Sequence, residues 1–366
     1  MKPSDPLQYL EDELAELDRR NLLREPPPPV APGTKSFCSN DYLGLAAAPP
    51  PEAPAGSGAS RLIAGERDQH RDLERALATW FDAEDALVFS SGYAANVGVL
   101  AALARPGDLV VSDALNHASL IDGARLSRAR VAVVPHLDLA AVDAALRGRE
   151  QGRAWVVVES YYSMDADGPD LAALRALCDA HGAALVVDEA HAIGVLGPGG
   201  RGRAAEAGVR PDVLVGTLGK SLGSQGAFVV GPRVLKRWLW NRARSFVFST
   251  GLSPASCAAA SRALAHLAEH PELPAKVLAL AGRLRARLAA GGVHAAGFGH
   301  VVPIVIGDPG RAMDLAAALR AAGFAVQAVR PPTVPEGTSR IRLTVTAAHD
   351  EADVDAVAAA VLATLR

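Results

Sequence analysis

The chain has few cysteines, few aromatic residues and no long apolar run. Its three cysteines, Cys38, Cys178 and Cys257, are far apart and have no metal-binding spacing, so we expect neither disulfides nor a metal site. No stretch of 18 apolar residues is free of charges or helix breakers, which predicts no membrane span. Residues 1–18 carry acidic side chains and lack the apolar centre of a signal peptide. Together these absences predict a cytoplasmic protein.

The charges are balanced, and the apolar residues are mostly aliphatic. The sequence holds 37 basic and 40 acidic residues, a formal net charge of −3, so there is no basic excess for binding nucleic acid. Apolar residues make up 49% of the chain and aromatic residues only 5%, so alanine, leucine and valine must build the core. A length of 366 residues is enough for two or three lobes around a large core.

Short strand-like runs alternate with helical patterns through the middle of the chain. Apolar spacing predicts helices at 72–81 and 170–181, and an amphipathic helix earlier, at 6–23. Runs rich in β-branched residues predict strands at 86–89, 109–112, 131–135, 155–159, 185–188, 213–216 and 228–230. Such alternation is typical of an α/β fold with a mostly parallel sheet covered by helices on both faces.

The pattern changes near residue 232. One long helical stretch is predicted at 255–290, followed by strands at 300–306 and 340–345 and a final helix at 351–365. This predicts a smaller C-terminal α+β domain. We therefore expect an N-terminal helical segment at 1–36, a large α/β domain at 37–235 and the C-terminal domain at 236–366.

Lys220 lies among glycines just after a predicted strand, and two chemistries suit this setting. A phosphate loop needs the pattern GxxxxGK[ST], but Leu214 stands where its first glycine belongs. Residues 188–191 spell DEAH, as in helicases, yet in those enzymes the phosphate loop precedes this box, and here the order is reversed. The sequence therefore favours the other chemistry, an amine that forms an imine with a cofactor aldehyde.

Three reactive side chains fall at the carboxyl ends of predicted strands. Glu159, Asp188 and Lys220 each end or follow a run of β-branched residues. Ligands of open α/β sheets bind along that edge, so we expect the three groups to converge. One carboxylate alone could merely cap a strand, but three reactive groups at one edge favour a binding site.

These groups match the needs of pyridoxal phosphate, which requires an amine, a carboxylate facing the pyridine nitrogen, and donors for the phosphate. Lys220 is the candidate amine, and Asp188, at the end of a buried strand, is the candidate carboxylate. His191 could reach the phenolic oxygen of the ring. Residues 90–96 (SSGYAAN) follow a strand and open a helix, so their free N–H groups and the helix dipole could bind the phosphate, together with Thr217.

Further polar residues complete the candidate site. His117 follows the predicted strand 109–112, where its imidazole could stack on the cofactor ring or donate to the substrate. Arg330, Arg340 and Arg342 suit an amino-acid carboxylate, because a planar guanidinium binds one through two parallel hydrogen bonds. Since Arg340 and Arg342 share a strand face, one could bind substrate while the other pairs with a structural carboxylate.

Taken together, eight stretches resemble the α-oxoamine synthase family of fold-type I pyridoxal-phosphate enzymes, whose fold is similar to that of aspartate aminotransferase. The resemblance covers nearly the whole chain, and the branch it most resembles is that of the 8-amino-7-oxononanoate synthases of biotin synthesis. The stretches are 37–45 (FCSNDYLGL), 56–62 (GSGASRL), 91–96 (SGYAAN), 116–120 (NHASL), 162–165 (YSMD), 187–191 (VDEAH), 217–220 (TLGK) and 330–335 (RPPTVP).

The resemblance implies a role for each matching residue. Lys220, His117 and Asp188 would be catalytic. The implied cofactor-binding residues are Lys220, Gly92, Tyr93, His117, Ser163, Asp188, His191, Thr217, Ser249 and Thr250. The family is a homodimer with its sites at the subunit interface, and Ser249 and Thr250 would reach the neighbour's phosphate. The implied substrate-binding residues are Arg24, for the far carboxylate of the acyl chain, Arg342, favoured for the amino-acid carboxylate, and Arg330, His117 and Thr333.

The implied activity is the decarboxylative condensation of L-alanine with pimeloyl-CoA, or with a pimeloyl-carrier protein, to 8-amino-7-oxononanoate, CO2 and a free thiol. Glycine C-acetyltransferase, 5-aminolevulinate synthase and serine palmitoyltransferase share the site and remain alternatives. Residues 112–117 (SDALNH) also resemble the glycine C-acetyltransferase branch, whereas the short chain and Arg24 favour the first activity. A silent subunit that keeps the fold for assembly is a further alternative, which the intact Lys220, Asp188 and His117 disfavour.

Overall fold

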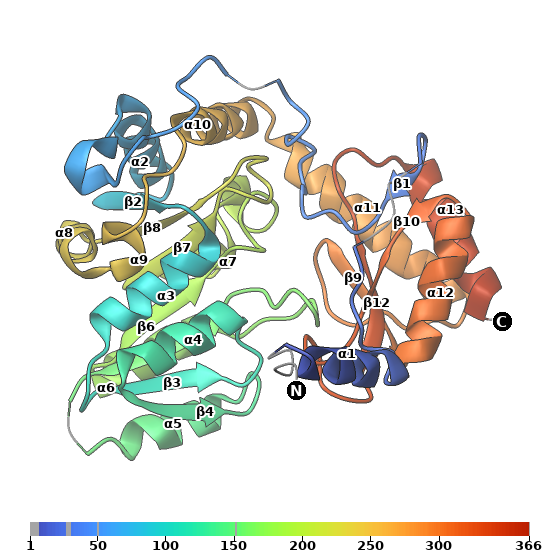
Figure 1. The fold of residues 1–366 in the computed structure, drawn as a ribbon, viewed down its shortest axis with the longest axis horizontal. Coiled ribbons are helices and arrows are strands. Elements are labelled where there is room, and N and C mark those ends of the chain that lie inside the picture. The colour runs from blue at the N-terminus through green and yellow to red at the C-terminus, as the bar shows by residue number, and fades with distance from the viewer. Residues whose placement is uncertain (1–6, 27–30, 50, 151, 366) are drawn as a thin grey trace, which may run out of the picture. The chain divides into compact units, whose positions relative to one another are not determined.

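β-Branched runs form the strands of a sheet in the larger of two units of the chain. The computed structural model describes residues 7–26, 31–49, 51–150 and 152–365. The described residues of 40–163 and 167–277 form the larger unit, and those of 1–39, 164–166 and 278–366 form the smaller unit (Figure 1). None of the described helices combines the length and the apolar character that a membrane crossing needs.

The larger unit contains a seven-stranded sheet in which five adjacent strands are parallel and β8 runs antiparallel to both of its neighbours. All seven strands confirm the sequence-predicted runs to within about two residues. In order across the sheet they are β2 (Asp85–Phe89), β8 (Ala227–Gly231), β7 (Val213–Thr217), β6 (Ala184–Asp188), β5 (Ala154–Glu159), β3 (Leu109–Asp113) and β4 (Arg130–Val134).

Helices cover both faces of this sheet, which explains why its strands are almost wholly apolar. Side chains alternate along β3, so that Val110 packs with Leu100 and Leu120 on one face, while Val111 packs with Leu174 on the other. The helices of this unit are α2 (Asp68–Trp80), α3 (Gly92–Leu103), α4 (Ala118–Ser127), α5 (Leu139–Arg147), α6 (Leu171–His181), α7 (Arg203–Glu206), α8 (Arg233–Arg242), α9 (Arg244–Val247) and α10 (Pro254–Glu269), with short turns at Arg61–Gly65 and Pro198–Gly200.

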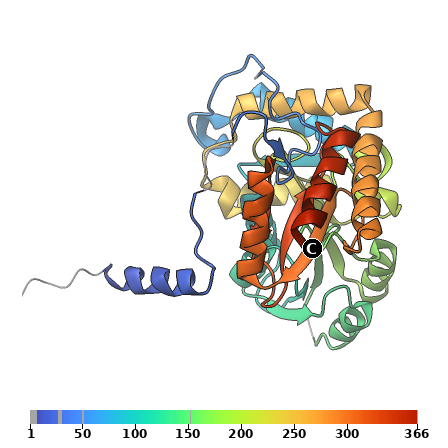
Figure 2. The same cartoon turned by 90° about the vertical axis from the view of Figure 1, so that its right-hand side faces the viewer.

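The smaller unit contains a three-stranded antiparallel sheet in the order β11 (Gln327–Val329), β12 (Ser339–Thr344), β9 (Val301–Gly307). Its helices are α1 (Tyr9–Arg19), α12 (Pro309–Ala321) and α13 (Glu351–Leu365), the last shown in red in Figure 2, together with the part of α11 (Glu272–Ala290) that follows residue 277. Ile341 of β12 packs with Leu284 of α11, Leu315 of α12 and Val357 of α13 in one core. The predicted final helix at 351–365 is therefore confirmed.

The limits of the two units differ from the domain boundaries expected after residues 36 and 235. Residues 35–36 join the smaller unit, because β1 (Lys35–Ser36) pairs with β10 (Phe324–Ala325). Residues 236–277 join the larger unit, because Leu239 of α8 packs in a core with sheet residues, and Cys257 of α10 packs beside Leu73 of α2.

Two helix predictions need correction or fall partly outside the described residues. The single helix expected at 255–290 is wrong, because α10 ends at Glu269 and α11 begins at Glu272. Pro271 lies between them, and proline has no N–H with which to continue a helix. The expected start of the first helix, at residue 6, lies outside the described residues, and its expected end at residue 23 is wrong, because the helix is observed at Tyr9–Arg19.

Candidate active site

Lys220 lies in a tight loop that connects the antiparallel strands β7 and β8. The Gly223 N–H donates to the carbonyl of Lys220 at 2.9 Å, and the Ser224 N–H donates to that of Leu218 at 2.9 Å. Gly223 has a φ of +54°, and a Cβ there would lie 2.5 Å from the carbonyl carbon of Leu45, so only glycine allows this close approach. A phosphate loop would lead into a helix, and this loop returns to a strand, which excludes that chemistry.

The amine of Lys220 contacts a histidine, which in turn contacts a tyrosine. Lys220 Nζ lies 2.7 Å from His191 Nε2, and His191 Nδ1 lies 2.6 Å from the hydroxyl of Tyr42. His191 is nearly buried, and Tyr42 is fully buried. The structure thus brings together the two predicted residues Lys220 and His191. It adds Tyr42, which lies within the family-like stretch 37–45 but received no role from the sequence.

Asp188 ends β6, where two donors hold its buried carboxylate. Asn96 Nδ2 donates to Oδ2 at 2.7 Å, and the Ala190 N–H donates to Oδ1 at 2.8 Å. Sequence reasoning did not assign Asn96, although it lies one turn into α3, in the stretch expected to open a helix. Asn96 Oδ1 is buried and has no partner among the described residues, so the site can accept one more donor beside Asp188.

His117 begins α4 at the same edge of the sheet and is linked to this network. Its Nδ1 lies 2.7 Å from the hydroxyl of Ser119, which accepts from Asn96 Nδ2 at 2.9 Å. Although the His117 residue is exposed, desolvation of its imidazole lowers the pKa of this group. The charge of Asp188 raises this pKa, and that of Lys220 lowers it. His117 is therefore held in its neutral form, which can accept a proton.

Glu159 ends β5 directly beside the end of β6, where its register partner is Asp188. Its Oε1 accepts from the His117 N–H at 2.7 Å. Burial, followed by the charge of Asp188, raises the pKa of Glu159 to about 8. The predicted convergence of Glu159, Asp188 and Lys220 at one edge is therefore seen in the larger unit.

The N-terminus of α3 presents backbone N–H groups at the carboxyl end of β2. The Ser91 hydroxyl accepts from the Ala94 N–H at 3.1 Å and caps the helix. The N–H groups of Gly92 and Tyr93 precede the first helical hydrogen bonds, and helix N-termini of this kind bind phosphate. The Tyr93 side chain is exposed, and its hydroxyl donates to the carboxylate of Asp122, which raises the pKa of the phenol.

The remaining predicted cofactor residues lie in loops of the larger unit. Thr217 ends β7, where its hydroxyl donates to the Gly226 carbonyl at 3.1 Å and accepts from the Gly219 N–H at 3.2 Å. Ser163 lies between β5 and α6, and Ser249 and Thr250 follow α9. The cofactor-binding roles of these four residues stay predictions.

In the smaller unit, the structure brings Arg24, Arg330 and Thr333 together. Arg24 Nη2 donates to Thr333 Oγ1 at 3.2 Å. Arg330 is buried, and its Nη2 donates to the carbonyl of Leu23 at 3.2 Å. Burial and the charge of Arg24 lower the pKa of Arg330. Two guanidinium groups and a hydroxyl therefore form a positive cluster that suits an anionic group.

The two arginines of β12 have different surroundings. Arg340 Nη1 pairs with Asp165 Oδ1 at 2.7 Å and also donates to the Met164 carbonyl at 2.8 Å. Arg340 therefore has the structural carboxylate that the sequence analysis foresaw for one member of the pair. Arg342, two residues further along β12, is also buried. Its role as the ligand of the amino-acid carboxylate stays a prediction.

The groups of the larger unit fit pyridoxal phosphate. A lysine amine is present for the aldehyde, and the buried Asp188 and the orphaned Asn96 oxygen can accept the N–H of a protonated pyridine ring. The Lys220–His191–Tyr42 chain and the N-terminus of α3 can hold the phenolic oxygen and the phosphate.

Comparisons with known proteins agree with this fit. The family model "Aminotransferase class I and II" matches residues 35–361. The chain is 47% identical to an 8-amino-7-oxononanoate synthase of Anaeromyxobacter dehalogenans, over 98% of this chain and 96% of that protein. It is 49% identical to one of Mycolicibacterium smegmatis, over 92% and 91%. A solved serine palmitoyltransferase with pyridoxal phosphate is similar with a TM-score of 0.91 and 28% identity, over 98% of both chains.

These similarities extend over nearly the whole chain. They confirm the expected fold-type I architecture, pyridoxal phosphate as the cofactor, and the assignment to acyltransferases rather than nucleotide hydrolases. The chain belongs to the class I and II aminotransferase family and, within it, to the family of 8-amino-7-oxononanoate synthases.

Proposed function

We propose that the protein condenses L-alanine with a pimeloyl thioester, of CoA or of a carrier protein, and releases CO2, the free thiol and 8-amino-7-oxononanoate. The observation that carries this proposal is the set of Lys220, His191, Asp188 and Asn96 at one sheet edge, in a chain 47% and 49% identical to enzymes of that name. When bound, pyridoxal phosphate supplies an electron sink for a carbanion at the amino-acid Cα.

Lys220 is the base that takes the proton from the alanine Cα. Its Nζ is 2.7 Å from His191, which in turn bonds to Tyr42, so the amine has a fixed direction and a partner that shares its proton. A general base must lie within hydrogen-bond reach of the proton that it removes, and this fixed position provides the required orientation. His117, held in its neutral form, is placed to donate to or accept from the substrate at the same edge.

Asp188 would face the ring nitrogen of the bound cofactor and keep it protonated. Its carboxylate is buried, and Asn96 and the Ala190 N–H hold it in one orientation. A buried carboxylate is stable only when donors or a cation meet it, so the two donors and the pyridine N–H together satisfy this anion.

The smaller unit supplies the groups that bind the substrate's anionic ends. The pimeloyl chain ends in a second carboxylate, which suits the positive cluster of Arg24, Arg330 and Thr333. Arg342 takes the carboxylate of alanine before it leaves as CO2. Arg340 forms an ion pair with Asp165 and has a structural role instead.

The protein acts as a cytoplasmic homodimer whose sites lie at the subunit interface. Phe248 is 72% exposed directly before Ser249 and Thr250, and α1 has no buried residue among its exposed leucines. Covering such exposed apolar side chains with a second copy of the chain would stabilise a dimer. The three cysteines form no disulfide with one another, which is compatible with a reducing compartment.

Replacement of Lys220 tests the proposal. Lys220→Ala should abolish the visible absorbance of the covalently held cofactor and reduce turnover of alanine with pimeloyl-CoA by several orders of magnitude, because both the anchor and the base are lost. Lys276→Ala, which changes an exposed lysine of α11, should leave both unchanged. Turnover retained in Lys220→Ala would contradict the mechanism.

The choice of substrates is tested separately on the wild-type protein. We expect CO2 release with alanine and pimeloyl-CoA to exceed that with glycine and acetyl-CoA or with serine and palmitoyl-CoA. A preference for glycine would instead assign the glycine C-acetyltransferase activity, and a preference for serine would assign the activity of the serine palmitoyltransferases. No turnover with any pair, despite bound cofactor, would support a silent subunit.

A further inference from the structure

Three potential metal ligands lie at the C-terminal end of α10, outside the residues that serve the cofactor. His266, Glu269 and His270 each offer one ligand atom, and these atoms lie within 4.8 Å of one another. Glu269 is exposed, and the two histidines are half-buried. Among the described residues, no other group of three histidines, cysteines or carboxylates meets this spacing.

The two histidines are neighbours on one face of the helix. Residues four apart lie one above the other in an α-helix, and the ring centroids of His266 and His270 are 4.2 Å apart. Tetrahedral zinc with ligand bonds of about 2.0–2.2 Å needs ligand atoms roughly 3.3 Å apart. The observed limit of 4.8 Å between ligand atoms exceeds this spacing. Small rotations about the side-chain bonds can bring the ligand atoms closer, because the three side chains are partly exposed on one turn of the helix.

Two further features favour a cation at this place. His270 Nδ1 lies 3.1 Å from the carboxylate of Glu272, the first residue of α11. A carboxylate on one ring nitrogen fixes the tautomer and leaves Nε2 to bind a metal. In addition, the carbonyl groups at the end of α10 carry the negative end of the helix dipole, which stabilises nearby positive charge.

Although the cysteine spacing predicted no metal site, we propose that His266, Glu269 and His270 bind one divalent transition-metal ion, with Zn²⁺ the ion that best suits two imidazoles and one carboxylate. Water completes the coordination, since three protein ligands leave a fourth position open. The ion joins the last turn of α10 to the start of α11 through the bond between His270 and Glu272, across the break at Pro271.

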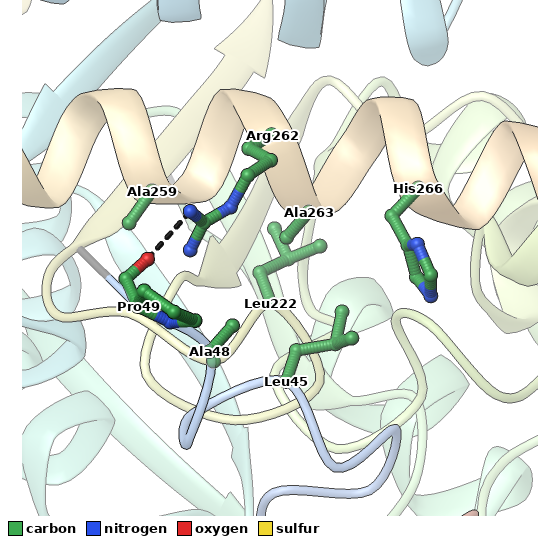
Figure 3. Close-up of a pocket in the computed structure, with 9 residues that line it drawn as sticks. Leu45, Ala48, Pro49, Leu222, Ala259, Arg262, Ala263 and His266 are labelled. Atoms are coloured by element: carbon green, nitrogen blue, oxygen red, sulfur yellow. Dashed lines mark hydrogen bonds between the residues drawn. The ribbon is translucent and has the colours of Figure 1, made fainter. Parts of the chain in front are cut away.

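His266 also lines a cavity of about 300 Å³ between α10 and two loops of the larger unit (Figure 3). Leu222 and Gly223, from the loop that carries Lys220, line the same cavity, and Arg262 bonds to the Pro49 carbonyl at its edge. The proposed ion therefore lies beside this cavity. Its link to Lys220 is indirect, because it runs across the cavity to Leu222, which is two residues after Lys220 in the sequence. We therefore expect the ion to affect stability more than turnover.

The test compares zinc uptake by the cofactor-loaded wild-type protein and by the double variant H266A/H270A. Equilibrium dialysis against Zn²⁺ after treatment with EDTA should load one more ion per chain on the wild type than on the double variant. Glu272→Gln, which removes the charge beside His270 but no metal ligand, should weaken zinc binding about 10-fold. Zinc should also raise the Tm of the wild type, because a ligand of the folded state stabilises it by mass action.

The exposed histidine His294 provides the matched control, since His294→Ala should bind zinc as the wild type does. Equal zinc uptake by the wild type and the double variant would overturn the proposal. If the double variant failed to fold, the site would be tested by adding Co²⁺ to the wild-type protein alone. Cobalt bound by two imidazoles and a carboxylate gives visible absorption bands. Their absence at saturating Co²⁺ would equally overturn the site.

Discussion

At the scale of single residues, two carboxyl groups at neighbouring strand ends have different surroundings. Asp188 meets Asn96 and the Ala190 N–H, two donors placed for an anion. Glu159 accepts from the His117 N–H, while burial and the charge of Asp188 raise its pKa to about 8. At neutral pH, Glu159 therefore keeps its proton.

The raised pKa of Glu159 predicts how stability depends on pH in the cofactor-free protein. The folded state holds this proton between the ordinary value of 4.5 and about 8, whereas the unfolded state releases it. The free energy of unfolding should therefore fall as the pH rises through this window. Glu159→Gln keeps an acceptor for His117 without a charge, so urea unfolding of this variant should lack that fall.

Glu206→Gln changes an exposed carboxyl group of α7 and should keep the wild-type pH profile. A Glu159→Gln profile that follows the wild type between about pH 5 and about pH 8 would contradict the assigned pKa.

At the scale of elements, the turn from β2 into α3 joins local helix chemistry to cofactor binding. Serine is a favoured N-cap because its hydroxyl satisfies an N–H that has no helical partner, and Ser91 accepts from Ala94 in this way. The N–H groups of Gly92 and Tyr93 lie in the same turn and are the donors predicted to bind the phosphate. Sequence spacing alone predicted this turn, because a strand, a serine–glycine pair and a helix follow one another.

Ser91→Ala should lower the free energy of unfolding by about 1 kcal/mol, the usual value of an N-cap. It should also weaken the binding of pyridoxal phosphate, because the first turn of α3 is less well ordered. Asp170→Ala removes the N-cap of α6, whose carboxylate accepts from Ala173, and serves as the control. Urea unfolding should show similar losses for the two variants, and a cofactor titration should differ only for Ser91→Ala. An equal loss of cofactor affinity in both would contradict this role of α3.

At the scale of the whole molecule, the two units hold different predicted functions. The larger unit carries the predicted cofactor residues, and the smaller unit carries the arginines expected to bind the substrate's carboxylates. Each unit has its own core, and the segment before β1 belongs to the smaller unit although 240 or more residues separate it from that unit's C-terminal part. Local sequence patterns do not contain such long-range pairing, which is why the expected boundaries differ from the observed ones.

The proposed interface sites predict that two inactive variants restore each other. Lys220→Ala lacks the base, and the double variant S249A/T250A lacks the donors expected to reach the neighbour's phosphate. A mixed dimer contains one site with Lys220 from one chain and Ser249 and Thr250 from the other. After unfolding and refolding together, random pairing should recover about a quarter of wild-type activity, on statistical grounds for a two-fold dimer.

The control is a mixture of the two variants that were refolded separately, so that their subunits do not exchange. Activity that stays at the mean of the separate variants after co-refolding would show that each site is built within one chain. Light scattering on the wild type should give twice the chain mass of 37.8 kDa.

The sequence by itself determined the seven strands of the large sheet, several helices and the identity of the reactive groups, because β-branched runs, helical spacing and N-caps are local properties. It also placed Glu159, Asp188 and Lys220 at one edge, since parallel strands align their carboxyl ends. Only the tertiary structure decided that Asn96 holds Asp188, that Tyr42 holds His191 and His191 holds Lys220, and that Arg340 pairs with Asp165. These partners are 92, 149, 29 and 175 residues apart, and no local rule relates side chains that meet only when the chain folds.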